Sequence, residues 1–190
     1  MHKLVTWGAN LVSSARLLLA GMWIIAFFNN HSRGHTLGVV ALAGAVSDLL
    51  DGRIARWTHS AGQFGHWLDN AADIVFVLTA LSYQAYAGTI PVYLPALVAA
   101  LFAQYALDSI VICGSAVPVK SYLGHWAGIL NYLLVIALAW MPAIVLTGPL
   151  PRVAAPLIAL FYMAAMCERA LFYRASWPAH LRWVRPVAGE

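Results

Sequence analysis

Long apolar stretches alternate with short polar or Gly/Pro-containing turns along this chain. A helix needs about 20 predominantly apolar residues to cross the hydrocarbon core of a bilayer. The stretches are rich in Ala and Leu and lack the period-two alternation of a half-buried strand, so they predict helices. The pattern predicts six membrane-spanning helices, at Gly8–Phe28, Thr36–Trp57, Phe64–Ala87, Pro91–Gly114, Tyr122–Thr147 and Val153–Tyr173.

Composition points to the same class of protein. The chain is 62% hydrophobic and only 9% charged, whereas soluble domains carry roughly 25% charged residues. We therefore expect an all-α integral membrane protein with one membrane domain, residues 1–175. Residues 176–190 differ in composition, and they predict a tail that is cytoplasmic or lies on the membrane surface.

The basic residues indicate an orientation for the predicted helices. The net charge of +4 comes mostly from Lys and Arg at one set of helix ends. Only Arg33 and Arg152 would face the opposite side, and Arg16 lies inside the first span. This positive-inside pattern predicts cytoplasmic termini in a multi-pass protein of the cell (inner) membrane, and it does not indicate nucleic-acid binding.

Acidic residues are concentrated in the second and third predicted helices. Four of the seven in the chain are Asp48, Asp51, Asp69 and Asp73, and carboxylates in apolar surroundings are costly unless they are paired or hold a metal. Steps of three and four residues place each pair on one side of its helix, about 60° and about 40° apart. Because a short turn joins the two helices, both pairs converge near the cytoplasmic end. Four carboxylates suit Mg²⁺ or Mn²⁺, and could hold two ions.

Two other interpretations of these acids remain open. They could form buried ion pairs with Arg16, Arg53 and Arg56. Acids inside membrane helices also occur in divalent-cation transporters, where they are distributed through the membrane depth and an inverted repeat is common. Here the acids cluster at one end and no repeat is apparent, which favours a site at the membrane edge.

At these positions the chain resembles the CDP-alcohol phosphotransferase family, whose pattern is D-x2-D-G-x2-A-R-x8-G-x3-D-x3-D. The pattern is complete here and comprises Asp48, Asp51, Gly52, Ala55, Arg56, Gly65, Asp69 and Asp73. A second, weaker match in the first predicted helix consists of Asn10, Ser13 and Arg16. The resemblance covers about residues 8–173.

The resemblance implies a phospholipid synthase that transfers a phosphatidyl group from CDP-diacylglycerol to a small polar alcohol and releases CMP. It implies that all four aspartates contact Mg²⁺ or Mn²⁺, and that Asp73 is the catalytic base on the acceptor hydroxyl. It also implies a homodimer whose partners are membrane lipids. The residues implied in binding the nucleotide or substrate are Asn10, Ser13, Ser14, Gly52, Ala55, Arg56, Gly62 and Gly65.

The acceptor is less well defined by the sequence. Lys120, His125 and Asp108 are candidates for binding it, although Asp108 could instead pair with a buried cation such as Arg16. Glycerol 3-phosphate is the first acceptor to consider, but the Pro and Lys that often flank the last two motif aspartates in glycerophosphate-using members are absent. The alternative within the family is transfer from CDP-choline or CDP-ethanolamine to a lipid alcohol. We expect Glu168 and Arg169 to form a local pair.

Overall fold

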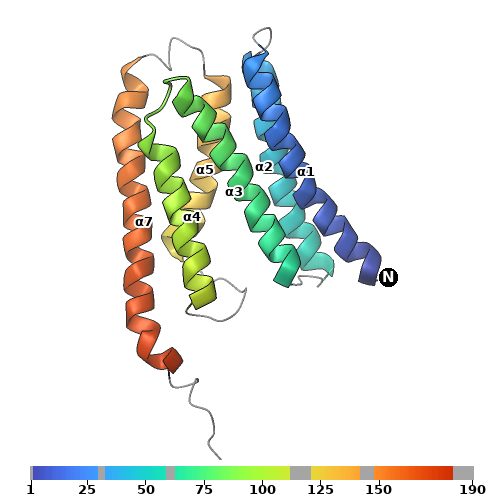
Figure 1. Ribbon diagram of the computed structural model, residues 1–190, viewed down its shortest axis with the longest axis vertical. Coiled ribbons are helices and arrows are strands. Elements are labelled where there is room, and N and C mark those ends of the chain that lie inside the picture. Colours follow the sequence, from blue (N-terminus) through green and yellow to red (C-terminus); the bar gives the residue numbers. More distant parts are fainter. Residues whose placement is uncertain (1, 30–32, 59–62, 112–120, 142–147, 182–190) are drawn as a thin grey trace, which may run out of the picture.

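A computed structural model describes residues 2–29, 33–58, 63–111, 121–141 and 148–181 (Figure 1). Its side chains are described for residues 15–29, 35–48, 69–108, 121–141 and 148–171. The described parts are helical and contain no strand, which confirms the all-α prediction. The helices are α1 (His2–Phe28), α2 (Arg33–Thr58), α3 (Gln63–Tyr86), α4 (Tyr93–Val111), α5 (Tyr122–Trp140) and α7 (Pro149–Leu181).

Each predicted span overlaps one described helix. The observed bounds differ from the predicted ones, most clearly in α5 and α7. The helix α5 ends at Trp140 because Met141, with φ −64° and ψ 133°, is extended. Proline at position 142 explains this, since the residue before a proline is driven away from helical geometry. The helix α7 is longer than its predicted span and continues to Leu181, past the start of the tail at residue 176.

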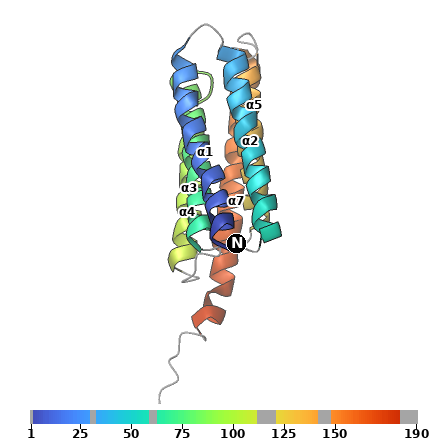
Figure 2. The ribbon, with the colours of Figure 1, turned by 90° about the vertical axis from the view of Figure 1, so that its right-hand side faces the viewer.

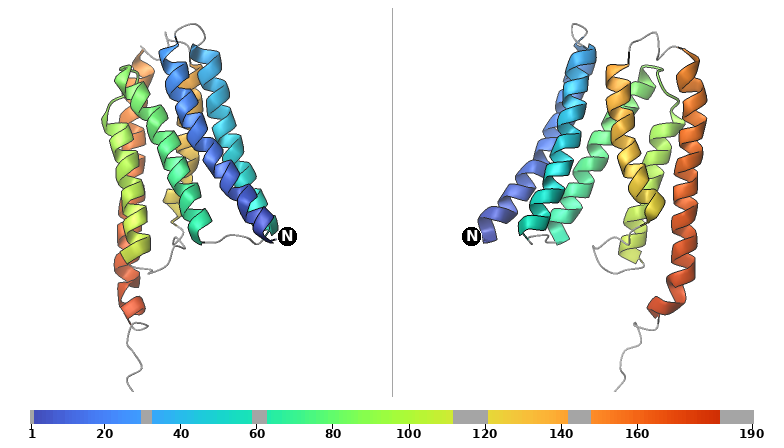
Figure 3. Two further views of the ribbon diagram at one scale, coloured as in Figure 1. Left: turned by 45° about the vertical axis from the view of Figure 1, so that its right-hand side comes forward. Right: turned by 180° about the vertical axis from the view of Figure 1, so that it is seen from behind.

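The helices form an up-and-down bundle in which chain neighbours run antiparallel (Figures 1 and 2). The helix α1 packs against α2 and α3, α2 also packs against α5, and α7 packs against α4 and α5. The first residue of α1 and the last residue of α7 lie at the same end of the bundle (Figure 3). That end also contains the last turns of α2 and the first turns of α3, which carry the motif aspartates.

The outward faces of the helices are apolar. Among the described residues, α5 and the stretch Pro149–Leu171 of α7 are long and apolar enough to cross a membrane, and Ala15–Phe28 and Tyr93–Asp108 are shorter apolar stretches. Large apolar side chains are nevertheless exposed on all six helices, for example Leu18, Val39, Val75, Leu107, Leu133 and Leu157. Apolar surface on this scale is typical of contact with lipid or another protein, because soluble monomers rarely expose large contiguous apolar patches.

The interior near the acids is closely packed. Trp23 of α1 and Phe76 of α3 are both fully buried, and their rings meet edge to face at 6.1 Å. Gly44 of α2 faces the same ring, since an added Cβ there would lie 2.6 Å from Cε1 of Phe76. The absence of a side chain at this position therefore lets the Phe76 ring of α3 reach the backbone of α2, one turn before Asp48.

Candidate active site

Arg16 lies at the centre of the α1–α2–α3 contact. It follows Ala15 and precedes a run of three leucines, and its side chain is fully buried. Its guanidinium donates to Asp48 of α2 at 3.4 Å and to Asp69 of α3 at 2.5 Å, and also to Asp73 of α3. A buried guanidinium needs such partners because an unpaired charge in an apolar interior is very costly.

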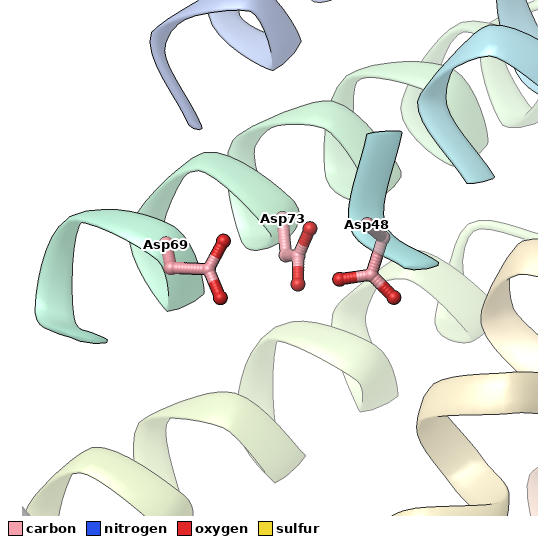
Figure 4. A group of neighbouring side chains, drawn as sticks. All are labelled: Asp48, Asp69 and Asp73. Atoms are coloured by element: carbon pink, nitrogen blue, oxygen red, sulfur yellow. The ribbon is translucent and has the colours of Figure 1, made fainter. Parts of the chain in front are cut away.

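Three motif aspartates converge as the sequence predicts. One carboxylate oxygen from each of Asp48, Asp69 and Asp73 lies within 4.8 Å of the other two. Figure 4 shows Asp69 and Asp73 on successive turns of α3, with Asp48 facing them from α2. The fourth residue, Asp51, lies in the next turn of α2, and its side chain is outside the described set.

The chemistry of the three carboxylates fits a divalent metal. All donors are oxygens, which Mg²⁺ and Mn²⁺ prefer. The Arg16 ion pairs expected under the alternative interpretation are also present. However, one guanidinium cannot neutralise three carboxylates, so these four side chains keep an excess of negative charge. The three carboxylates are 36%, 31% and 20% exposed, so ions can reach them.

Tyr132 is a site residue that the sequence motif did not reveal. It lies on α5, and its hydroxyl donates to Oδ1 of Asp73 at 2.6 Å, while its ring stacks on Phe76 with centroids 6.3 Å apart. Oδ1 of Asp73 thus accepts bonds from both Tyr132 and Arg16. The only sequence signal was a phenol within an apolar span, where the hydroxyl needs a partner.

A cavity of about 580 Å³ adjoins this cluster. It lies between α3, α4, α5 and α7, next to the first turns of α5. Asp73 therefore belongs both to the carboxylate cluster and to the wall of the cavity. The described residues that line it are Asn70, Asp73, Leu101, Phe102, Tyr105, Ser121, Gly124, His125, Gly128, Asn131 and Arg169.

Asp108 forms a structural pair with a buried cation, as the sequence indicated, and the cation is Arg169. Arg169 of α7 donates from Nε to Oδ2 of Asp108 at 2.7 Å, and the guanidinium lies 4.6 Å from the ring centroid of Tyr105. The partner is Arg169 and not the example Arg16 because α4 packs against α7, whereas Arg16 is bonded to the motif aspartates.

The expected local pair between Glu168 and Arg169 is wrong, because the two side chains bond to different helices. Glu168 accepts hydrogen bonds from the Ser121 hydroxyl at 2.8 Å and from the backbone N–H groups of Tyr122 and Leu123 at 3.1 and 2.9 Å. These donors belong to the start of α5, where a carboxylate satisfies N–H groups that lack helical partners.

The other predicted site residues divide into three groups. His125 is exposed and lines the cavity. Gly62 and Lys120 lie outside the described residues. The remaining ones lie on helices at the same end of the bundle, with their side chains outside the described set; they are Asn10, Ser13, Ser14, Gly52, Ala55, Arg56 and Gly65.

Comparison with known proteins agrees with the motif and the fold. A cardiolipin synthase (CMP-forming) from Streptomyces coelicolor is 38% identical over 92 residues, which cover 45% of this chain and 41% of that protein. Putative cardiolipin synthases from Mycobacterium bovis and Mycobacterium tuberculosis are 29% identical over 82 residues, which cover 43% of this chain and 39% of each relative. The chain thus matches about two fifths of the length of these relatives.

A family-level match extends much further along the chain. Residues 7–173 match the family described as CDP-alcohol phosphatidyltransferase. This range contains all of α2 to α5, most of α1 and α7, and all four motif aspartates. This match agrees with the pattern of eight residues in α2 and α3 and with the convergence of its acids. The chain belongs to the CDP-alcohol phosphatidyltransferase family.

Proposed function

We propose that this protein transfers a phosphatidyl group from CDP-diacylglycerol to an alcohol and releases CMP, in a reaction that requires a divalent metal. One observation carries the proposal. Asp73 is shared between the carboxylate cluster and the wall of a cavity that can take the acceptor. A single carboxylate can thus meet the hydroxyl of one substrate beside the place where the diphosphate of the other is held.

The metal site is proposed from the oxygen donors on α2 and α3. Asp48, Asp69 and Asp73 would hold Mg²⁺ or Mn²⁺, with Asp51 as the fourth ligand implied by the motif; four carboxylates are enough for two ions. When bound, the metal would offset the negative charge of the diphosphate and of the departing CMP. Gly52, Arg56 and the other motif positions at this end of the bundle are proposed to bind the nucleotide.

Asp73 is proposed to remove the proton from the acceptor hydroxyl. Its Oδ1 is held by Arg16 and Tyr132, and among the described residues Oδ2 accepts no hydrogen bond. Oδ2 is therefore available to take the proton as the acceptor oxygen bonds to the β-phosphorus and the bond to CMP breaks. A general base needs this kind of fixed position, within hydrogen-bond reach of the proton, more than an unusual proton affinity.

The membrane explains how the donor reaches the site. The motif acids lie in the second half of α2 and the first half of α3, and these halves lie at the same end of the bundle (Figure 1). The nucleotide would therefore remain at the bilayer edge while the acyl chains stay among the exposed apolar side chains. We propose that this end faces the cytoplasm, as the distribution of basic residues predicts. A homodimer is proposed from the family resemblance alone, and cross-linking in membranes tests it.

Two acceptor classes fit this activity. A small polar alcohol such as glycerol 3-phosphate is one. The similarity to proteins named cardiolipin synthase (CMP-forming) favours a second, the glycerol head group of a phospholipid, because cardiolipin contains a glycerol esterified by two phosphatidyl groups.

The test supplies purified protein with radiolabelled CDP-diacylglycerol, Mg²⁺ or Mn²⁺ and a panel of soluble and lipid alcohols. We expect CMP release with at least one alcohol, a new phospholipid detected by mass spectrometry, and loss of both signals in EDTA. Absence of CMP release across the whole panel would contradict the proposal. Uptake of Mn²⁺ into proteoliposomes without nucleotide would instead support the transporter alternative.

A further inference from the structure

Two adjoining cavities lie at the end of the bundle opposite the motif aspartates, where α3 ends and α7 begins (Figure 1). The outer cavity, of about 400 Å³, is formed by the connection between α3 and α4, residues 87–91, and by the start of α7, including Arg152. The inner cavity, of about 230 Å³, lies between α4, α5 and α7. Ile90 and Pro151 line both cavities, so the two lie side by side.

The inner cavity is lined by apolar side chains. Every described residue of its lining is apolar, as are Leu94 of α4, Leu138 of α5 and Ile158 of α7. Such side chains offer water no hydrogen-bond partner, and apolar cavities of this kind stay dry and accept apolar ligands. The inner cavity therefore suits a hydrocarbon chain.

The outer cavity differs because a cation lines it. Arg152 is exposed, and within the part of the chain that the structure describes it makes no ion pair or hydrogen bond. Residues 29–36, 87–92 and 141–152, which connect or begin the helices at this end, contain no Asp or Glu. The chain therefore supplies no carboxylate near Arg152, and its charge is best matched by an anion from outside the protein.

The wall of the outer cavity is held in shape by hydrogen bonds. Gly88, with φ 75°, adopts the left-handed conformation just after α3. The Thr89 hydroxyl donates to the backbone oxygen of Gln84 at 2.6 Å and to its Oε1 at 2.8 Å, and Gln84 donates to the backbone oxygen of Leu138 at 3.4 Å. These bonds tie the α3–α4 connection to α5, so the site is largely preformed, as ligand sites usually are.

We propose that the two cavities together bind one anionic phospholipid, in the leaflet opposite the motif aspartates. Arg152 binds the phosphate, whose oxygens match the planar fork of a guanidinium, and an acyl chain enters the inner cavity. Inorganic phosphate would fill only the outer cavity. A zwitterionic head group is less suitable, because its ammonium would find no carboxylate at this end.

This lipid is a bound ligand and not a substrate. None of the described residues that line the two cavities belongs to the motif. The inference therefore does not rest on the proposed function, and it can fail or hold independently of it.

The experiment uses dioleoyl phosphatidic acid as the probe, because this lipid has no head-group alcohol and cannot serve as an acceptor. Purified protein in detergent is mixed with this lipid, with dioleoyl phosphatidylcholine or with inorganic phosphate. Wild-type protein is compared with Arg152→Gln and with Arg33→Gln. Arg33 is a matched control, since it begins α2 at the same end of the bundle. Binding is measured by lipid retention in native mass spectrometry and by the shift in unfolding temperature.

We expect phosphatidic acid to be retained by wild-type protein and Arg33→Gln and to raise their unfolding temperatures. Arg152→Gln should bind it at least ~10-fold more weakly, as expected for loss of a charged hydrogen bond. Arg152→Lys should recover part of the loss, because lysine keeps the charge without the fork. Phosphatidylcholine should bind wild-type protein more weakly than phosphatidic acid does, and inorganic phosphate should give no shift.

A second pair of variants tests the inner cavity. Ala154→Phe places a ring in it, because Ala154 is part of its lining. Leu157→Phe is the control, since Leu157 is 64% exposed on the outward face of the same helix. We expect Ala154→Phe to weaken phosphatidic acid binding at least ~4-fold, as for loss of one or more buried methylene groups. Leu157→Phe should leave the affinity within about twofold.

The inference is wrong if Arg152→Gln binds phosphatidic acid as wild-type protein does, or if Arg33→Gln weakens binding equally, which is the signature of general surface charge. Equal binding of the two lipids, or equal stabilisation by inorganic phosphate, would also overturn it. If Ala154→Phe and Leu157→Phe bind alike, no acyl chain enters the inner cavity. The arginine variants change exposed side chains, so their comparison decides the question even if Ala154→Phe does not fold.

Discussion

Two networks of charged side chains in this bundle differ in their ratio of acidic to basic residues. Around Arg16, three carboxylates from α2 and α3 surround one guanidinium, and their side chains are 20–36% exposed. Between α4 and α7, one carboxylate meets one guanidinium, and the two side chains are 16% and 4% exposed. Among the described residues, the acids of the first network outnumber its one arginine and are open to ions, whereas the second network joins one acid to one arginine and is much less exposed.

The comparison shows how a binding site can be told from a structural ion pair in an apolar protein. A balanced pair reduces the cost of burying charge and needs nothing further. Surplus charge of one sign is unfavourable unless a ligand of the opposite sign completes it. The acid-rich network therefore indicates an incoming cation, whereas the balanced pair indicates a fixed side chain. Four substitutions test this difference.

The largest expected effect is on turnover in Asp73→Asn. An amide cannot accept the proton of the acceptor hydroxyl, so we expect kcat to fall about 10²–10⁴-fold, the range of general-base contributions. Binding of a CDP-lipid analogue should persist, because Asp48 and Asp69 remain. CMP release and equilibrium binding measure the two quantities. A variant that keeps more than a tenth of wild-type kcat would show that Asp73 is not the base.

The second-largest expected effect is a loss of folding stability in Arg16→Met. Removing the guanidinium leaves three neighbouring carboxylates without their shared partner, so we expect a loss of about 3 kcal/mol in EDTA, as for broken buried pairs. Mn²⁺ should restore part of this loss, since a ligand that binds only the folded state stabilises it. Thermal unfolding in micelles with EDTA or Mn²⁺ measures both. Equal Mn²⁺ shifts in the variant and wild-type protein would contradict a shared cation site.

Asp108→Asn should have a smaller effect because the amide oxygen can still accept the bond from Arg169. We expect a loss of about 2 kcal/mol, since a neutral acceptor replaces a charged one for a buried guanidinium. The shift in unfolding temperature produced by Mn²⁺ should equal that of wild-type protein. A larger Mn²⁺ shift would mean that the two charge networks are coupled, and the comparison would fail.

The smallest effect is expected for Tyr132→Phe. The substitution removes the 2.6 Å bond to Asp73 but keeps the ring that stacks on Phe76. We expect kcat to fall about 5–10-fold, in line with roughly 1 kcal/mol for one hydrogen bond, with the KM for CDP-diacylglycerol unchanged. Steady-state kinetics with both substrates varied give these values. An unchanged kcat would remove Tyr132 from the positioning of Asp73.

The sequence was sufficient to predict the acid cluster but not its surroundings. Asp69 and Asp73 are four residues apart on one helix, a short connection makes α2 antiparallel to it, and both helices pack against α1. Local geometry therefore brings Asp48 to both of them. The clear motif in α2 and α3 also predicted the family, which the match over residues 7–173 confirms.

Tyr132 and the Asp108–Arg169 pair could not be predicted in the same way. They lie in α4, α5 and α7, whose contacts join residues about sixty positions apart. In these helices apolar residues occur on nearly every face, so the periodicity does not show which face packs inward. The register between distant helices is set by side-chain packing, which a single sequence does not reveal.

The adjacency of Glu168 and Arg169 has a mechanical consequence. Glu168 is bonded to the first residues of α5, and Arg169 is bonded to α4, so one turn of α7 tethers two neighbouring helices at the same depth. Any shift of α7 along its axis must either carry both helices with it or break charged hydrogen bonds. The walls that α4, α5 and α7 contribute to the cavity are therefore held to one another at this depth.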